Sequence, residues 1–307
     1  MVKGTVLYGI NNIFTVATEQ GTRECRLKGK TLKDAEGEHN PLAPGDRVLF
    51  EEDPQEPRAG LIARRLPRQN AFTRWNRNSQ SFQTLAVNLD RVVCVSSAEK
   101  PPFRPRFIDR VCMEAEKGGI PLIILLNKID LGLPDEVRKR MIDYRRLGYD
   151  VFTCSARKHQ GLEEIKTMVD QGTSVFLGQS GVGKSTILNT LFPGLGLRTG
   201  EISRKYNRGI HTTVFSLMIP QENGAIIDTP GIRELDVRGV SPVELPWLFR
   251  DFRSFIPSCS LRNCSHLEEP GCAVREAVAS GGIHPDRYES YKTLLASLVE
   301  QEESKYR

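Results

Sequence analysis

The sequence predicts a multidomain protein with a small N-terminal β-barrel, a central α/β domain on a mainly parallel sheet, and a mainly helical C-terminal domain. Three observations predict this order. Strand-like runs separated by turn residues fill the first 68 residues, and apolar runs then alternate with helix-like stretches around a glycine-rich loop at 178–185. Three cysteines and a histidine gather between residues 259 and 272. The expected domains are 1–68, 69–235 and 236–307.

Composition narrows the class of protein. A chain of 307 residues with 39% hydrophobic and 26% charged residues is typical of a soluble globular protein, and no apolar run reaches transmembrane length. The net charge of +5 leans mildly towards polyanionic partners. Met1–Gly4 leads straight into a strand-like pattern, so no signal peptide is predicted, and seven cysteines, an odd count, favour a reducing compartment. We expect a cytoplasmic, monomeric protein with no membrane partner.

The first 68 residues predict a closed barrel. Five short strands are expected at Gly4–Tyr8, Ile13–Ala17, Thr22–Leu27, Arg47–Phe50 and Leu61–Ala63. Among small barrels of this size, the OB-fold is the commonest that binds nucleic acids. The pattern fits equally well a barrel that binds RNA and one that only docks on its neighbour.

The exit from the barrel, residues 57–89, contains no acidic residue. Six arginines there are interleaved with Phe72, Trp75 and Phe82. Arginine pairs with phosphates and aromatic rings stack on bases, which favours RNA contact. The alternative is a linker whose aromatic side chains pack on the next domain.

The loop Gly178–Ser185 fits G-x-x-x-x-G-K-[ST], between a strand-like run at Ser174–Leu177 and a helix-like run at Thr186–Phe192. Its glycines let backbone N–H groups face a polyphosphate, and the helix N-terminus adds positive charge. Lys184 is expected to reach the outer phosphates and Ser185 to ligate Mg²⁺. A chance match in a glycine-rich turn is the alternative. The expected nucleotide contacts are Gly178, Gln179, Ser180, Gly181, Val182, Gly183, Lys184, Ser185 and Thr186.

A guanine-reading motif, Asn127-Lys128-Ile129-Asp130, follows an apolar strand expected at 122–126. Asp130 can accept hydrogen bonds from the ring N–H and exocyclic amine of guanine. Asn127 can bond the base edge and brace the loop, and the stem of Lys128 can lie over the ring. In isolation the motif is a weak match that fits a plain turn, but its place at the end of a buried strand strengthens it.

Other elements of the central domain surround these two motifs. We expect a buried strand at 91–95, helices at 106–117 and 134–147, a strand at 150–154 and a helix at 161–169. The strand at 150–154 runs into Ser155-Ala156, whose small side chains let the backbone approach the guanine carbonyl.

Two switch-like segments follow the phosphate loop. The polar, basic stretch 199–213 includes Thr212 and Thr213, either of which can close over Mg²⁺ and the terminal phosphate; an ordinary surface loop is the alternative. Strands expected at 214–219 and 225–227 lead into Asp228-Thr229-Pro230-Gly231. Asp228 can hold Mg²⁺ through water, and the Gly231 amide can sense the terminal phosphate.

The residue after this D-x-x-G motif is Ile232, where Ras-type GTPases place a water-orienting glutamine. Isoleucine cannot do this, so hydrolysis is slow alone or another group orients the water. His211 is the best local candidate, because imidazole exchanges hydrogen bonds near neutral pH. A histidine that only packs or contacts RNA is equally compatible with the sequence.

The C-terminal cluster, Cys259-x4-Cys264-x-His266-x5-Cys272, offers three thiolates and one imidazole. Such a set closes the tetrahedron of a structural Zn²⁺ and leaves no position for a catalytic water. Buried free cysteines or a disulfide pair are the alternatives. Helices are expected before and after the cluster, at 244–255 and 285–303.

The motif order, with N-K-I-D before the phosphate loop and D-T-P-G after it, resembles the RsgA (YjeQ/YloQ) family of circularly permuted GTPases over nearly the whole chain. That resemblance implies an OB-fold, a permuted P-loop GTPase domain and a zinc-finger domain, with GTP/GDP, Mg²⁺ and one structural Zn²⁺. It also implies slow intrinsic hydrolysis that the small ribosomal subunit, bound through its rRNA, stimulates late in that particle's maturation. By family position Thr213 is the preferred switch threonine for Mg²⁺. Ile210 departs from the polar or basic residue that is more usual in the family, which puts a local RNA contact in doubt.

The sequence is therefore compatible with two classes of function. One is an RNA-dependent GTPase that acts on the small ribosomal subunit, and the other is a GTP-regulated binding module with a non-ribosomal RNA or protein target. Asn127 and Asp130 argue against an ATPase. In the permuted order the second switch leads straight into the C-terminal region, so we also expect nucleotide state to bias the position of that region.

Overall fold

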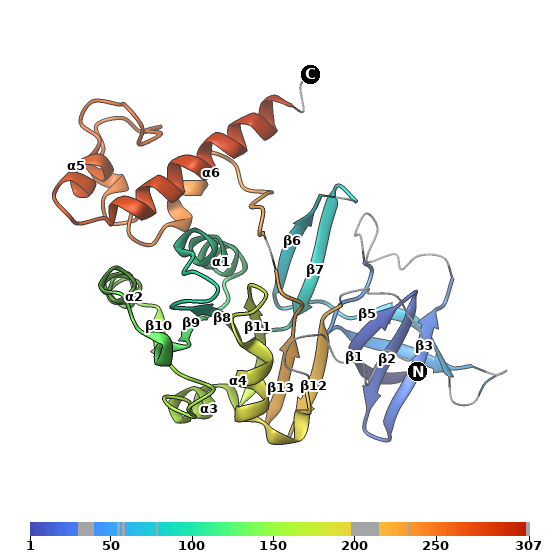
Figure 1. The fold of residues 1–307 in the computed structure, drawn as a ribbon. Helices are drawn as coiled ribbons and strands as arrows, with labels where there is room; N and C mark the ends of the chain where they lie inside the picture. The colour runs from blue at the N-terminus through green and yellow to red at the C-terminus, as the bar shows by residue number, and fades with distance from the viewer. Residues whose placement is uncertain are drawn as a thin grey trace.

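A computed structural model describes residues 1–29, 40–53, 56, 59–77, 79–197, 215–232 and 234–304. Within these ranges the chain forms an N-terminal barrel, a central sheet flanked by helices and a C-terminal helical region (Figure 1). No helix among the described residues combines the length and apolar character needed to span a membrane. The predicted fold class is confirmed, while the predicted boundaries after residues 68 and 235 stay predictions.

The barrel consists of β1 (Val2–Ile10), β2 (Ile13–Thr18), β3 (Gly21–Leu27), β4 (Arg47–Glu52) and β5 (Ala59–Arg65). It closes in the order β1-β2-β3-β5-β4, with β3 parallel to β5 and the other neighbours antiparallel. Alternate residues such as Val6, Val16 and Ile62 fill its interior, which is the period expected of strands with one buried face. The predicted OB-type barrel is thus present.

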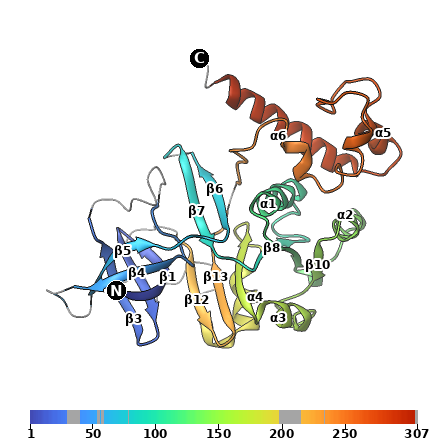
Figure 2. The ribbon, with the colours of Figure 1, turned by 180° about the vertical axis from the view of Figure 1, so that it is seen from behind.

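A hairpin that the sequence pattern did not predict follows the barrel. Its strands, β6 (Ala71–Asn76) and β7 (Ser81–Val87), form a separate two-stranded sheet. Phe72 is fully buried in the core of the central domain, against helix α1 (Pro105–Gly118). On its other side, β7 is bonded to the barrel: the Asn40 amide donates to the Thr84 carbonyl at 3.0 Å. The hairpin therefore lies between barrel and central sheet (Figure 2).

The central six-stranded sheet has the order β10-β9-β8-β11-β13-β12. Its strands are β8 (Arg91–Ser97), β9 (Leu122–Asn127), β10 (Asp150–Thr153), β11 (Gly172–Gly178), β12 (Leu217–Gln221) and β13 (Gly224–Asp228). All neighbours are parallel except β12, which runs antiparallel to β13 at the edge. Its helices besides α1 are α2 (Asp135–Arg146), α3 (Glu163–Val169) and α4 (Lys184–Leu191).

Both faces of this sheet are buried, which explains its near-continuous apolar strands. Val92 and Ile124 face one core together with α1, whereas Val93 and Ile123 face a second core with α3 and α4. Because β8 to β11 and β13 are parallel, their carboxyl ends meet at one edge of the sheet. That edge brings together the loops that begin at Asn127, Gly178 and Asp228.

The C-terminal region contains α5 (Ala273–Ala279) and α6 (Pro285–Glu303), and the helix predicted at 285–303 is confirmed. The helix predicted at 244–255 is wrong: that stretch contains one short 3₁₀ segment, Leu245–Leu248, and a second, Ile256–Ser258, follows it. Phe249 has an extended backbone (φ −89°, ψ 108°) that ends the first segment. The break lets the rings of Phe249 and Phe252 both contact Tyr291, so tertiary packing overrides local helix propensity.

Helix α6 is attached to the central domain by a buried ionic network. The Arg287 guanidinium donates two hydrogen bonds to Asp251, at 2.8 and 2.7 Å, and one to Asp109 of α1 at 2.8 Å. Arg140 of α2 also donates to Asp109, and the Ser290 hydroxyl donates to the same carboxylate at 2.7 Å. Each charged side chain named here has an oppositely charged partner, as buried charges require, although Nε of Arg140 is buried without a hydrogen-bond partner.

Candidate active site and metal centre

The phosphate loop follows β11 and ends at the start of α4, in a conformation that needs glycine. Gly181 and Gly183 have φ of 82° and 96°. A Cβ on Gly183 would lie 2.4 Å from the side-chain Nδ2 of Asn127, and one on Gly178 would lie 2.4 Å from the Val95 carbonyl oxygen. No side chain among the described residues caps the N-terminus of α4. Its first amides therefore remain available to an anion.

Lys184 and Asp228 lie beside this loop and interact electrostatically. The Lys184 side chain is buried, and burial lowers its pKa while the Asp228 carboxylate opposes that shift. Burial raises the pKa of Asp228 to about 6, against the opposing effect of Lys184. Within the described part of the chain, Oδ1 of Asp228 is buried without a hydrogen-bond partner. An unpartnered buried carboxylate oxygen fits Mg²⁺ or one of its waters.

Asn127 joins the phosphate loop to the loop after β10. Its side chain is 2% exposed. Its Nδ2 donates to the Val182 carbonyl at 2.9 Å, and its Oδ1 accepts from the Ala156 amide at 3.0 Å. The three segments that the sequence singled out for guanine and phosphate are therefore held together through one amide group.

The other residues predicted to read the base lie at the same edge of the sheet. Asp130 is exposed, and its Oδ1 accepts from the buried Ser155 hydroxyl at 2.6 Å, which lowers the pKa of Asp130. A carboxylate that stays ionised offers acceptors only, which matches the N–H donors of guanine. The Lys128 ammonium donates to the Gly181 carbonyl at 2.6 Å and to the carbonyl of Lys100. Nothing in the sequence indicated the contact with Lys100.

The predicted second switch, residues 228–231, lies against the phosphate loop. The Thr229 hydroxyl donates to the Phe176 carbonyl at 2.7 Å, and the Ile232 amide donates to the Gly178 carbonyl at 3.0 Å. A Cβ on Gly231 would lie 3.0 Å from the Ser180 backbone. The Ile232 side chain is 1% exposed and lies in the hydrophobic core, so it contributes no polar group to the site.

The first-switch candidates fall outside the described residues, which leave out 198–214. These candidates are His211, Thr212 and Thr213. Ser185 and Thr186 are half-buried in the first turn of α4, beside Lys184.

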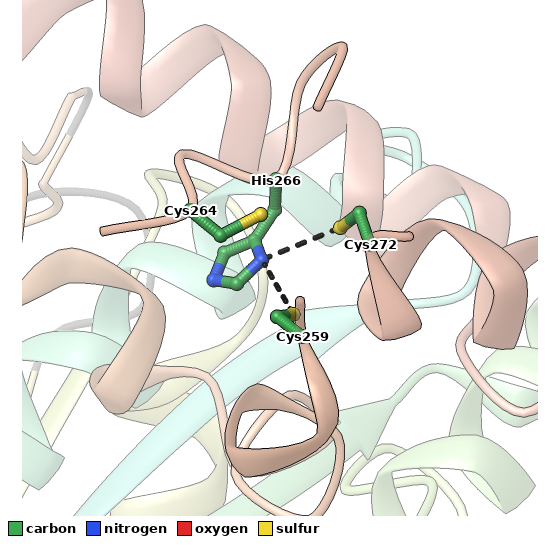
Figure 3. A group of neighbouring side chains, drawn as sticks. All are labelled: Cys259, Cys264, His266 and Cys272. Atoms are coloured by element: carbon green, nitrogen blue, oxygen red, sulfur yellow. Dashed lines mark hydrogen bonds between the residues drawn. The ribbon is translucent and has the colours of Figure 1, made fainter. Parts of the chain in front are cut away.

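The C-terminal cluster brings its four candidate ligands together (Figure 3). The Nδ1 atom of His266 lies 3.6 Å from the Cys259 sulfur and 3.5 Å from the Cys272 sulfur, and the ligand atoms of all four residues lie within 4.8 Å of one another. The described cysteines form no disulfide. Three sulfurs and one nitrogen at this spacing fit a single tetrahedral Zn²⁺.

Hydrogen bonds from outside the cluster hold its loop in place. The Tyr288 and Tyr291 hydroxyls donate to the carbonyls of His266 and Ser265, at 2.6 and 2.7 Å. The Glu269 carboxylate accepts from backbone amides of the same loop, including Ser265 at 2.5 Å. Supporting contacts of this kind orient metal ligands.

The arginine- and aromatic-rich stretch after the barrel is largely occupied by contacts within the chain. Phe72 is buried, and Trp75 and Phe82 stack edge to face with ring centroids 5.1 Å apart. Arg68 makes two 2.8 Å hydrogen bonds to the buried carboxylate of Asp46. The packing alternative describes Phe72, whereas Phe82 is 38% exposed, and RNA contact by the stretch 57–89 stays a prediction.

Known proteins resemble this chain over nearly its whole length. Family models described as the RsgA N-terminal domain and the RsgA GTPase match residues 3–62 and 65–238. A *Borreliella burgdorferi* protein named small ribosomal subunit biogenesis GTPase RsgA is 37% identical over 295 residues, covering 95% of each chain. A *Chlorobaculum parvum* protein of the same name is 39% identical over 308 residues, covering 97% of this chain and 99% of its own.

Two solved structures have the same architecture. YjeQ from *Thermotoga maritima* aligns with a TM-score of 0.75 and 31% identity, over 97% of this chain and 98% of its own. YloQ, described as a circularly permuted GTPase, aligns with a TM-score of 0.70 and 27% identity, over 98% of this chain and 96% of its own.

Proposed function

The chain belongs to the RsgA family of GTPases, and we propose that it binds the small ribosomal subunit and acts late in that particle's maturation, where the particle stimulates its hydrolysis of GTP to GDP and phosphate. The observation that carries the proposal is the bridge through Asn127, which joins a guanine-type loop to a phosphate loop in one site. The relatives named for small-subunit biogenesis match nearly the whole chain, which supports the choice of partner.

Each site residue has a proposed role. The backbone of 178–186 holds the phosphates, Lys184 neutralises their charge, and the Gly231 amide senses the terminal phosphate. Bound Mg²⁺ supplies further neutralisation of phosphate charge; Ser185 and Thr213, with Thr212 beside it, would hold it directly and Asp228 through water. The guanine is held by Asn127, Lys128, Asp130, Ser155 and Ala156. Cys259, Cys264, His266 and Cys272 would hold one structural Zn²⁺.

Slow hydrolysis without a partner follows from the core position of Ile232. Because isoleucine cannot orient the attacking water, another group must do so, and His211 is the candidate within the chain. We also propose that the protein is cytoplasmic and monomeric and that it has no membrane partner.

We expect small ribosomal subunits to raise GTP turnover by at least about tenfold. A partner that supplies the missing water-orienting group, or places one correctly, raises the rate of hydrolysis by more than this factor in other GTPases. Turnover is measured with the full chain alone and with purified small subunits. Large subunits and transfer RNA serve as controls and should leave the rate unchanged. Equal rates in all four conditions would favour the other reading, a GTP-regulated switch with a non-ribosomal RNA or protein target.

Asp130→Asn is expected to weaken GTP binding by about 100-fold, because two hydrogen bonds from guanine to a charged acceptor are lost. The same variant should gain affinity for xanthosine triphosphate, whose ring carries an oxygen where guanine carries an amine. Both affinities are measured by calorimetric titration. Asp135→Asn, an exposed aspartate at the start of α2, is the matched control and should bind GTP normally. An equal loss of affinity for both nucleotides would remove Asp130 from base recognition.

A further inference from the structure

The segment that leaves the second switch, residues 234–239, is here called the exit strap. It passes between α1 and the β6–β7 hairpin on its way to the C-terminal region, and both views show it beside the hairpin (Figures 1 and 2). On the α1 side, Arg110 donates to the Leu235 carbonyl at 3.2 Å, and Lys117 donates to the Arg238 carbonyl at 2.9 Å. The Leu235 side chain is fully buried. The strap is therefore held at fixed points.

The hairpin holds the other side of the exit strap through Arg77. Its Nε and Nη2 donate to the two carboxylate oxygens of Asp236, at 2.7 and 2.8 Å. The pair is bidentate, and the hydrogen bond from Arg77 lowers the pKa of Asp236. Nη1 of the same guanidinium lies 3.3 Å from the Glu234 carboxylate. The Arg77 side chain, directly after β6, thus contacts two residues of the strap.

Aromatic side chains of the hairpin also contact the strap. The Arg238 guanidinium lies 4.3 Å from the centroid of the Trp75 ring, a cation–π distance. A Cβ on Gly239 would lie 3.0 Å from the Phe82 ring, so the strap backbone passes directly over that side chain. A displacement of the strap would therefore change the surroundings of the Trp75 ring.

The same hairpin is bonded to the barrel at its other end. Asn40 exchanges two hydrogen bonds with the backbone of Thr84, at 3.0 and 3.2 Å. The Val87 amide donates to the Pro44 carbonyl at 3.1 Å, and the Asn88 side chain donates to the Gly45 carbonyl at 2.8 Å. Continuous contacts thus run from the barrel through the hairpin to the exit strap, which begins three residues after Gly231.

We propose that the β6–β7 hairpin couples the barrel to the second switch, with Arg77 as the positioning residue that holds the exit strap. The inference rests on the proposed GTPase function. A nucleotide that draws Gly231 towards its terminal phosphate pulls on the strap, and the contacts of Arg77 with Glu234 and Asp236 transmit that pull to the hairpin. By reciprocity, a partner that shifts the barrel and hairpin biases the second switch.

Trp75 provides a direct readout. The chain has two tryptophans, so Trp247→Phe leaves Trp75 as the sole indole fluorophore. We expect its emission to differ between the GDP complex and a complex with a non-hydrolysable GTP analogue, and Arg77→Ala to reduce that difference by at least about half. Identical emission in the two complexes, with both nucleotides bound by calorimetry, would overturn the coupling and leave the GTPase proposal intact. Failure to bind either nucleotide would remove both proposals.

Kinetics test the role of Arg77 in turnover. Arg77→Ala and Asp236→Ala should each lower the kcat stimulated by small subunits by about two- to thirtyfold, with GTP affinity unchanged. The double variant should be no slower than either single variant, and the reversed pair Arg77→Glu with Asp236→Arg should recover activity. Arg74→Ala is the matched control, because Arg74 bonds Gln83 within the hairpin and should leave kcat unchanged. Unaltered kcat in both single variants, or additive losses in the double variant, would overturn the proposal.

Discussion

Lys184→Ala is expected to abolish GTP hydrolysis, with a loss in turnover of at least about 100-fold. Lys184 is buried in the phosphate loop, where its charge acts in a low-dielectric environment. Its removal also acts on Asp228, whose pKa burial already raises to about 6 while Lys184 opposes the rise. Without that cation the pKa of Asp228 rises further, so more of the carboxylate is protonated at neutral pH and its grip on Mg²⁺ weakens.

The measurement is steady-state turnover together with the affinity for GTP at several Mg²⁺ concentrations. Lys166→Ala, an exposed lysine on α3, is the matched control and should retain the wild-type rate. Thermal unfolding checks that the variant is folded. A folded Lys184→Ala protein with normal turnover would show that the loop does not hold the reacting phosphate.

Loss of the zinc site is expected to unfold the C-terminal region. Structural Zn²⁺ in small sites contributes about 10 kcal/mol or more of folding free energy, so Cys272→Ser or chelation should remove most of the order there. Cys272 is also the residue that precedes α5, and Tyr288 and Tyr291 of α6 bond the loop that carries His266. Both helices therefore depend on the cluster.

The destabilisation should extend into the central domain, because Arg287 and Ser290 of α6 contact the buried carboxylate of Asp109. If α6 leaves, that carboxylate loses two partners. Zinc content by atomic emission, and hydrogen exchange across 241–304, measure the effect. Cys25→Ser in the barrel core is the control and should keep one zinc per chain. A native exchange pattern in zinc-free protein would refute a structural role for the metal.

Elements with a strong local pattern were predictable from the sequence. The strands at 122–127 and 172–178 are apolar on both faces because each packs against helices on both sides, and this leaves a continuous apolar run in the sequence. The phosphate loop is encoded by glycines whose backbone conformation or close contacts exclude other residues. The cysteines and histidine of the metal centre were recognisable from ligand type and spacing.

Elements that depend on long-range contacts were not predictable in the same way. The stretch 244–255 looks helical, but the rings of Phe249 and Phe252 both pack on Tyr291, about 40 residues away, and the chain breaks to allow it. The β6–β7 hairpin is stabilised by a barrel loop on one side and by α1 and the exit strap on the other. Its aromatic residues suggested stacking on RNA bases, yet most of them pack within the protein.

The sequence by itself determined the barrel, the permuted order of the nucleotide motifs, the guanine-type loop and the composition of the metal centre. Each of these depends on residue type and spacing within a short stretch. Only the tertiary structure decided that Arg77 pairs with Asp236, that Arg287 joins α6 to Asp109, and that Asn127 bridges two loops. A sequence does not show whether a charged or polar side chain contacts water or a residue far along the chain. Only the folded path of the chain brings two such residues together.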